Sequence, residues 1–240
     1  MKSPLSINPK QNVERITEFL KMTFKEQKID KVVMGLSGGI DSTVALYLLK
    51  KVLPAENIFA VQMDYNPRKN INIDLNGVSV INISIRKIID EFKIDDKIRL
   101  GNIMARVRMI ILFDLAKQLG GLVCGTENKS EKLLGYFTRF GDAASDLEPL
   151  SHLYKTQVYE LAKYLKVPEE IINQKPTAGL WNGQTDEGDF GFTYEEADQV
   201  LSLISEHQAL DDKKRFPNAE KIINRMQKNQ FKQKVPYSLK

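Results

Sequence analysis

The chain has 240 residues, 42% of them hydrophobic, which is enough for one large α/β domain or two small ones. Its 35 basic and 31 acidic residues leave a net charge of +4, too small and too evenly spread an excess to indicate a nucleic-acid partner. The longest apolar runs, such as residues 109–113, fall far short of the roughly 18 residues of a membrane span, and prolines interrupt any signal-peptide core. A single Cys124 excludes a disulfide framework. We therefore expect one cytoplasmic domain over residues 1–240 that does not bind membranes.

The first quarter of the chain predicts a helix followed by a strand, a turn, a second helix and a second strand. Apolar residues recur at intervals of three and four over residues 9–27, and Asn8-Pro9 is a typical helix start. Apolar runs at residues 32–34 and 58–63 predict two buried strands. The helix between them is expected to end by Pro54.

The next stretch continues the alternation of strands and helices. A long polar loop is expected over residues 64–76, then a strand at 78–83, a short helix at 85–92, a long helix at 100–119 and a strand at 122–125. This alternation predicts a doubly wound parallel sheet with helices on both faces, an α/β fold. Ligands in such sheets bind at the carboxyl ends of the strands, which would gather Ser37, Asp64 and Thr126 around one crevice.

A glycine turn between the first strand and its helix has the composition of a phosphate cradle. Glycines let the backbone approach an anion closely, and the following helix directs its N–H groups and its positive dipole end toward it. Two serines add hydroxyl donors. The residues of the turn are Gly35, Leu36, Ser37, Gly38, Gly39, Ile40, Asp41 and Ser42.

Asp41 is the unusual member of this turn. A carboxylate in an anion site repels the ligand unless a divalent cation stands between them, so we interpret Asp41 as a Mg²⁺ ligand. The turn is not a Walker A motif, because that pattern has lysine at the position of Asp41.

Further polar segments follow the strand at residues 122–125. They are Gly-Thr-Glu-Asn-Lys-Ser-Glu (125–131), Tyr-Phe-Thr-Arg-Phe-Gly-Asp (136–142), Leu-Tyr-Lys-Thr-Gln (153–157), Pro-Thr-Ala-Gly-Leu (176–180) and Gly-Gln-Thr-Asp-Glu (183–187). Together with the cradle, they resemble in order the motifs of ammonia-dependent NAD synthetases, members of the PP-loop superfamily of ATP pyrophosphatases. The resemblance covers roughly residues 10–236.

The resemblance implies a role for each matching residue. Residues 35–42 would cradle the ATP phosphates, and Asp41 and Glu131 would hold Mg²⁺. Further ATP contacts would come from Thr126, Lys155 and Thr177. The deamido-NAD substrate would be held by Arg106, Arg139, Asp146 and Lys232. Asp142 matches a carboxylate near the ammonia site, and we take Asp142 and Lys155 as the catalytic pair.

The sequence departs from the family pattern in three places. Phe231 occupies the position before Lys232 that is often histidine, so a hydrogen bond from that histidine is absent. Arg139 stands where several relatives have lysine, which keeps the charge but changes the contact geometry. The expected loop at residues 64–76 also differs, so no ATP contacts are transferred to it.

The implied reaction is amidation of deamido-NAD with ammonia in two steps. ATP adenylates the nicotinic acid carboxylate and releases pyrophosphate, and ammonia then displaces AMP to give NAD. The first step requires neutralisation of phosphate charge, and the second requires a group that attracts ammonium and accepts its proton. The family resemblance also implies a homodimer with the substrate site at the interface, which the broad apolar arc of residues 100–119 would permit.

Three other functions share the cradle. A glutamine-dependent NAD synthetase would need an added amidohydrolase domain with a catalytic cysteine, and a tRNA-modifying ligase would normally carry RNA-binding additions. A non-catalytic ATP-binding module would bind ATP without Mg²⁺-dependent release of pyrophosphate. Asp41, Glu131 and Lys155 favour the enzyme over this module.

Overall fold

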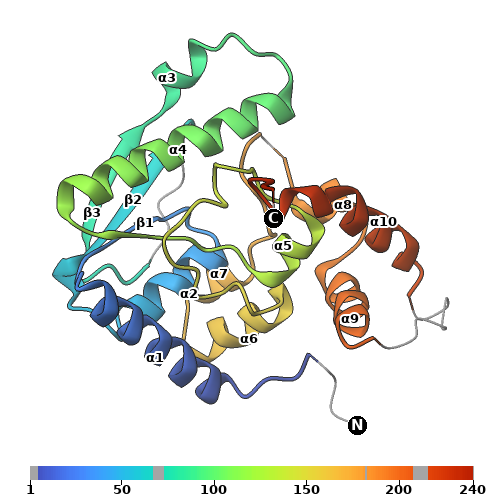
Figure 1. Cartoon of the computed structure of the whole chain (residues 1–240), viewed down its shortest axis with the longest axis horizontal. Coiled ribbons are helices and arrows are strands. Elements are labelled where there is room, and N and C mark those ends of the chain that lie inside the picture. The colour runs from blue at the N-terminus through green and yellow to red at the C-terminus, as the bar shows by residue number, and fades with distance from the viewer. Residues whose placement is uncertain (1–4, 67–72, 182, 208–215, 240) are drawn as a thin grey trace.

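The fold is a parallel sheet with helices on both faces (Figure 1). It was obtained as a computed structural model that describes residues 5–66, 73–181, 183–207 and 216–239. Within these ranges four strands pair side by side, all parallel, in the order β3-β2-β1-β4. The strands are β1 (Val32–Gly35), β2 (Ile58–Asp64), β3 (Ser79–Ser84) and β4 (Leu122–Cys124). Residues 67–72 of the loop predicted at 64–76 lie outside the described residues.

Helices cover both faces of the sheet, as predicted for a doubly wound fold. In Figure 1, α1, α2 and α6 lie on one side of the strands, and α3 and α4 lie on the other. The helices are α1 (Pro9–Gln27), α2 (Ile40–Leu49), α3 (Arg86–Asp90), α4 (Lys97–Leu119), α5 (Lys129–Leu134), α6 (Lys155–Tyr164), α7 (Glu169–Ile172), α8 (Asp186–Phe190), α9 (Tyr194–Ser205) and α10 (Ala219–Asn229), with 3-10 turns η1 (Ala55–Asn57) and η2 (Gln230–Lys232).

The strand order fixes where a ligand can bind. The chain runs from β1 outward to β2 and β3, then returns to place β4 on the other side of β1. The loops that follow β1 and β4 therefore diverge and leave a crevice at the carboxyl edge of the sheet, which is the usual ligand site of open α/β sheets. The glycine turn follows β1, and residues 125–131 follow β4.

Local capping explains where the long helices begin and end. The side chain of Asn8 accepts a hydrogen bond from the backbone N–H of Gln11 at 3.2 Å, which confirms the predicted start of α1. Helix α4 begins three residues before the predicted position, because the carboxylate of Asp96 accepts from the N–H of Arg99 at 2.7 Å. Gly120, with φ of 69°, ends α4 in the left-handed conformation.

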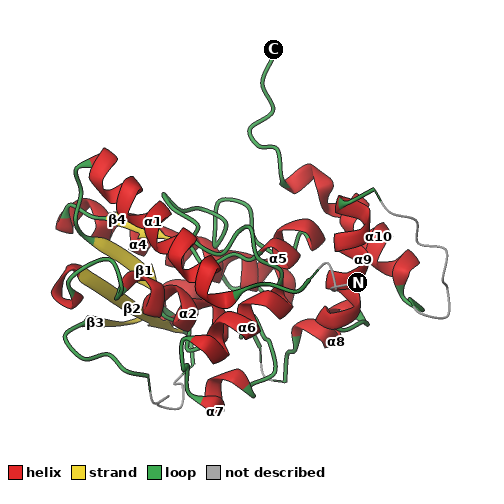
Figure 2. Ribbon diagram, turned by 90° about the horizontal axis from the view of Figure 1, so that it is seen from below, coloured by secondary structure: helices red, strands yellow, loops and turns green. Residues whose placement is uncertain are grey.

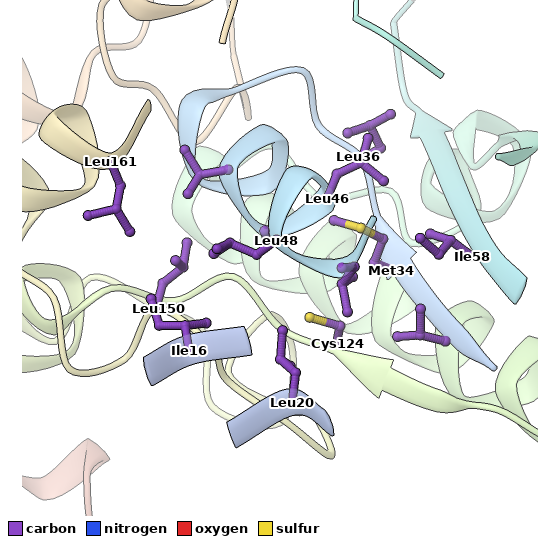
Figure 3. Packing of buried hydrophobic residues seen from close by; sticks show 14 of the residues in the cluster. Ile16, Leu20, Met34, Leu36, Leu46, Leu48, Ile58, Cys124, Leu150 and Leu161 are labelled. Atoms are coloured by element: carbon purple, nitrogen blue, oxygen red, sulfur yellow. The ribbon is translucent and has the colours of Figure 1, made fainter. Parts of the chain in front are cut away.

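The main core lies between the sheet and the helices α1, α2 and α6. Figure 3 shows Ile16 and Leu20 of α1 and Leu48 of α2 pointing into the same space as Leu161 of α6, and all four are buried. Cys124 of β4 also faces this core and is a free, buried thiol. The core holds β1 in place, and with it the turn that begins at Gly35.

A separate apolar cluster joins the later helices. It contains buried side chains from α5, α8, α9 and α10, among them Leu134, Phe190, Tyr194, Leu201 and Ile222. Figure 2 shows the sheet toward one end of the molecule and α8, α9 and α10 at the other, with α5 and α6 between. This cluster fixes the second half of the chain against the crevice. No helix in the described ranges is long and apolar enough to cross a membrane.

Replacing Leu48 by alanine should remove part of the main core. Leu48 is fully buried, so the change leaves a cavity, and we expect a loss of about 2–5 kcal/mol in the free energy of unfolding. Urea titration followed by circular dichroism measures this loss. The matched control is Leu239→Ala at a fully exposed position, which should leave the midpoint unchanged. A loss below about 1 kcal/mol for Leu48→Ala would contradict the packing described here.

Candidate functional site

The glycine turn forms a compact loop between β1 and α2. Gly38 has a positive φ of 78°, which only glycine adopts without strain, and Gly39 caps α2. The hydroxyls of Ser37 and Ser42 lie 3.0 Å apart, and the Ser37 hydroxyl accepts from the N–H of Gly39 at 3.2 Å. The turn thus places small polar groups at the N-terminus of a helix, where the dipole favours an anion.

Lys155 lies between two carboxylates that come from distant parts of the chain. Its Nζ is 2.6 Å from Oδ2 of Asp41 and 3.3 Å from Oε1 of Glu131. The lysine side chain is only 3% exposed, and the two carboxylates are 16% and 18% exposed. Burial by itself would lower the pKa of Lys155, but the two carboxylates raise it well above the ordinary value. The lysine is therefore firmly charged.

The three charged residues are held by the backbone of three helices. Asp41 lies in the first turn of α2, Glu131 in the first turn of α5, and Lys155 is the first residue of α6. Asn128 connects two of them. Its Nδ2 donates to Oδ1 of Asp41 at 3.0 Å, and its Oδ1 accepts from the N–H of Glu131 in a capping box.

Asp198 of α9 holds the N-terminus of α6. Its Oδ2 accepts from both the backbone N–H and the hydroxyl of Thr156 at 2.8 Å, and Oδ1 accepts from the hydroxyl of Ser130. Ser130 in turn accepts from the N–H of Lys155 at 2.8 Å. Asp198 is fully buried, and burial raises its pKa to about 6. The backbone of Lys155 is thus fixed by a buried polar network.

The donor set around Lys155 fits magnesium. Asp41 and Glu131 supply hard carboxylate oxygens that already surround a positive charge. Within the described ranges, no group of three or more histidine, cysteine, aspartate or glutamate side chains could hold a metal. Two carboxylates suit an ion that takes its remaining ligands from water and substrate phosphates, as Mg²⁺ does.

A large pocket of about 1420 Å³ opens over this site. Its wall includes the cradle and runs from there along α4 to the segment around Trp181. Several residues predicted for the site line it, namely Gly35, Leu36, Ser37, Gly39, Ile40, Asp41, Thr126, Glu131, Asp142, Lys155, Thr177 and Lys232. Gly38 and Ser42 belong to the same turn without lining the pocket. Asp64, the last residue of β2, was also expected at the crevice but does not line the pocket. Its neighbours Met63 and Tyr65 do.

Three residues predicted to hold deamido-NAD do not line the pocket of this chain. Arg106 is exposed on α4, whereas Arg108 lines the pocket and donates to the carbonyl of Met63 at 3.3 Å. Asp146 is exposed, and its Oδ2 accepts from the N–H of Val123 at 2.7 Å. The guanidinium of Arg139 lies 5.1 Å from the centre of the Phe231 ring. Two of the three places at which the sequence departs from the family pattern are therefore in contact.

Asp142 lines the pocket and is exposed to solvent there. Partial desolvation raises its pKa, while the backbone N–H of Thr138, 3.0 Å from Oδ1, opposes that rise. Two more carboxylates, those of Glu127 and Glu148, interact with its charge. Burial raises the pKa of Glu127 to about 8 and that of Glu148 to about 7. The charge of Asp142 adds to both shifts, and the charge of Glu148 adds to the shift of Glu127.

Sequence reasoning missed Asn128 and Asp198. The capping box of Asn128 was visible as Asn-x-x-Glu before an apolar pair, but its link to Asp41 joins residues 87 positions apart. Asp198 stands in the middle of an amphipathic helix and carries no local signal. Its role follows only from the packing of α9 against α5 and α6.

The fold and the site together define a nucleotide-binding α/β protein of the PP-loop type, with a glycine turn, a carboxylate in that turn and a buried lysine opposite it. The sequence profile of the family described as NAD synthase matches residues 12–236. A relative from Thermoplasma acidophilum, an NH(3)-dependent NAD(+) synthetase, is 42% identical over 242 residues, which covers 96% of this chain and 98% of the relative. The chain belongs to the NAD synthase family.

Solved structures agree with this assignment. An NH3-dependent NAD synthetase from Campylobacter jejuni superimposes with a TM-score of 0.79 at 34% identity and covers 98% of this chain and all of the other. An NMN synthetase from Francisella tularensis gives a TM-score of 0.82 at 32% identity, with 98% and 99% coverage. The expectations of a doubly wound parallel sheet and of membership in this family are confirmed.

Glu127 should make the stability of the protein depend on pH. Its pKa is about 8 in the folded chain against 4.5 ordinarily, so between these values the unfolded chain is ionised while the folded one keeps its proton. Stability should therefore fall as pH rises from 5 to 8. Because one pKa unit corresponds to about 1.4 kcal/mol, we expect Glu127→Gln to reduce this fall by about 1–3 kcal/mol in chemical denaturation at the two pH values.

The control for this measurement is Glu56→Gln in the exposed turn η1, which should keep the pH slope of the unmodified protein. An identical slope for Glu127→Gln and the unmodified protein would show that Glu127 is ionised in the folded chain throughout this range.

Proposed function

We propose that the protein catalyses ATP-dependent amidation of deamido-NAD with ammonia to give NAD, AMP and pyrophosphate. The observation that carries this proposal is the buried Lys155 between Asp41 and Glu131, beside the glycine turn at the carboxyl edge of the sheet. The family membership and the NH(3)-dependent NAD(+) synthetases among the relatives support it.

The first step is attack of the substrate carboxylate on the α-phosphorus of ATP. In this proposal the turn at residues 35–42 holds the phosphates with backbone N–H groups and the hydroxyls of Ser37 and Ser42. Lys155 supplies a fixed positive charge where negative charge gathers on the leaving pyrophosphate. Thr126 and Thr177, both on the pocket wall, are further ATP contacts. Mg²⁺ held by Asp41 and Glu131 would neutralise phosphate oxygens.

The second step is attack of ammonia on the adenylated carboxyl carbon, with AMP leaving. Ammonium must lose a proton before it can attack. Asp142 is our candidate for this base, because it lines the pocket and desolvation raises its pKa, which makes the carboxylate a stronger base.

We also propose that the protein acts as a homodimer that shares its substrate site. Helix α4 buries one side against the sheet through Met104 and Val107 but leaves Ile110 61% exposed. Arg106 is exposed one turn before Ile110, so both can reach the same partner surface. A shared site would explain why three residues that are proposed to bind deamido-NAD do not line the pocket of their own chain. These residues are Arg106, Arg139 and Asp146.

A second candidate substrate is the mononucleotide, nicotinic acid mononucleotide. The structural similarity to the Francisella tularensis NMN synthetase, with a TM-score of 0.82, favours including it, since amidation at the nicotinic acid ring is the same chemistry. A cytoplasmic location stays a prediction that rests on the single free cysteine.

The function is tested by supplying ATP, Mg²⁺ and deamido-NAD with either ammonium or glutamine and measuring NAD, AMP and pyrophosphate. We expect equal amounts of the three products with ammonium and no NAD with glutamine. Nicotinic acid mononucleotide in place of deamido-NAD decides between the two substrates by the ratio of kcat/KM. Release of ADP, or ATP binding without product, would overturn the proposal in favour of another nucleotide-binding activity.

Asp41→Asn should lower the rate of pyrophosphate release about a hundredfold or more, because a neutral amide cannot hold Mg²⁺ beside the phosphates. The assay follows pyrophosphate at saturating ATP over a series of Mg²⁺ concentrations, and circular dichroism checks the fold. Asp30→Asn, at an exposed position before β1, is the matched control and should keep the full rate. Near-normal turnover of Asp41→Asn would exclude Asp41 as a metal ligand.

A further inference from the structure

Arg225 lies on the pocket wall, and its guanidinium makes no hydrogen bond to any residue that the structure describes. The residue lies on α10 and lines the same pocket as Lys155 and Lys232. Its Nε is fully buried and makes no hydrogen bond, and no ion pair joins its guanidinium to any carboxylate of the described residues. A guanidinium carries five N–H donors in a planar fork, so a partly buried one without acceptors is costly unless a ligand supplies them.

Aromatic rings hold this guanidinium in place. Its Cζ lies 4.5 Å from the centre of the Phe190 ring and 5.5 Å from that of Tyr136, and the two rings pack edge to face. Contacts of this kind favour one position of the guanidinium. The residue is therefore oriented before any ligand arrives, which lowers the entropic cost of binding.

Two aspartates interact electrostatically with Arg225 but accept no hydrogen bond from it. Asp189, on the same wall, accepts at Oδ2 from the hydroxyl of Tyr136 and from Nε2 of Gln184, both at 2.9 Å. Asp186 accepts at Oδ2 from the hydroxyl of Tyr194 at 3.1 Å. Burial lowers the pKa of Arg225, and the charges of these aspartates offset the effect only in part. The local protein thus attracts the guanidinium but does not satisfy its donors.

The two lysines on the same wall differ from Arg225 in this respect. Lys155 is paired with two carboxylates, and Nζ of Lys232 donates to the backbone carbonyls of Gly135 at 2.7 Å and Phe137 at 3.0 Å. Lys232, predicted to bind deamido-NAD, therefore also fixes the end of α5. Arg225, which no sequence motif singled out, donates to no acceptor of the described residues.

We propose that Arg225 binds phosphate oxygens of a nucleotide substrate in this pocket. The guanidinium fork matches two oxygens of one phosphate, and the pocket of about 1420 Å³ has room for a nucleotide. Two substrates of the proposed function could supply this phosphate, so the proposal rests on that function for the identity of the ligand. The two sources are the β- and γ-phosphates that leave as pyrophosphate, and the pyrophosphate bridge of deamido-NAD.

The test measures binding of each source separately, without turnover. Inorganic pyrophosphate with Mg²⁺ and deamido-NAD alone are titrated by calorimetry into the unmodified protein, Arg225→Met and Arg225→Lys. The matched control is Lys228→Met, which removes an exposed charge from the same helix. We expect Arg225→Met to weaken binding of one or both probes about tenfold or more, since charge-assisted bidentate bonds are the strong class. The probe that loses affinity identifies the phosphate source.

Arg225→Lys separates phosphate binding from a structural role of the stacked side chain. It keeps the charge and the stem but lacks the fork, so it should restore only part of the lost affinity, and Lys228→Met should bind both probes as the unmodified protein does. Binding of both probes within about twofold by a folded Arg225→Met would overturn the proposal. Should Arg225→Met not fold, full affinity in Arg225→Lys would overturn it in the same way.

The outcome is distinguishable from failure of the proposed function. Lack of NAD formation by the unmodified protein would refute the amidation reaction, whereas the two titrations measure affinity whether or not turnover occurs. In the kinetic assay of Arg225→Met, the KM of the affected nucleotide should rise about tenfold with a smaller change in kcat. The reason is that Arg225 is proposed to bind the substrate, whereas Asp142 is proposed to take part in proton transfer.

Discussion

The structure depends on one buried electrostatic arrangement, a lysine between two carboxylates at the carboxyl edge of a parallel sheet. Three helices begin at this point and contribute Asp41, Glu131 and Lys155. Charges taken out of water are stable only when they are paired and held in good geometry. The first turns of α2, α5 and α6 must therefore meet within a few ångströms, and this requirement constrains the fold around them.

Much of the remaining structure serves that requirement. The main core fixes β1 and α2 and so places the glycine turn. Asn128 connects α5 to Asp41, and Asp198 reaches from α9 to hold the start of α6. Buried polar networks of this kind are stable when every member is satisfied, and they favour one arrangement of the chain over others. The later helices are thus part of the support of the site as well as of its wall.

The pocket combines two regions with different chemistry. The sheet side offers small backbone and hydroxyl groups suited to phosphates, and the side formed by α5, α8 and α10 offers aromatic rings and the guanidinium of Arg225. The contact between Arg139 and Phe231 lies near the second region, where this chain departs from the family pattern at both positions. A second copy of α4 would complete the surface around Arg106 in the proposed dimer.

The sequence by itself determined the elements and the chemical character of the site. Apolar spacing, the Asn8-Pro9 start and the glycine turn are local signals between residues a few positions apart, and they predicted the helix at 9–27, the parallel strands and the cradle. The start of α4 was displaced because a single cap, Asp96, outweighed the apolar pattern. The family motifs indicated that Glu131 and Lys155 belong to the site, but they did not show that these two side chains contact each other.

Only the tertiary structure decided which residues meet. The pair of Lys155 and Asp41 joins positions 114 residues apart, and Asp198 contacts Thr156 across 42 positions. No short sequence window contains both members of such a pair. The same reason separates Arg106, Arg139 and Asp146 from the pocket of their own chain and places Arg225 on its wall, since topology and the packing of α10 on α5 and α9 set these positions. The chemistry of each side chain determines what it can do, and the fold determines which partner it contacts.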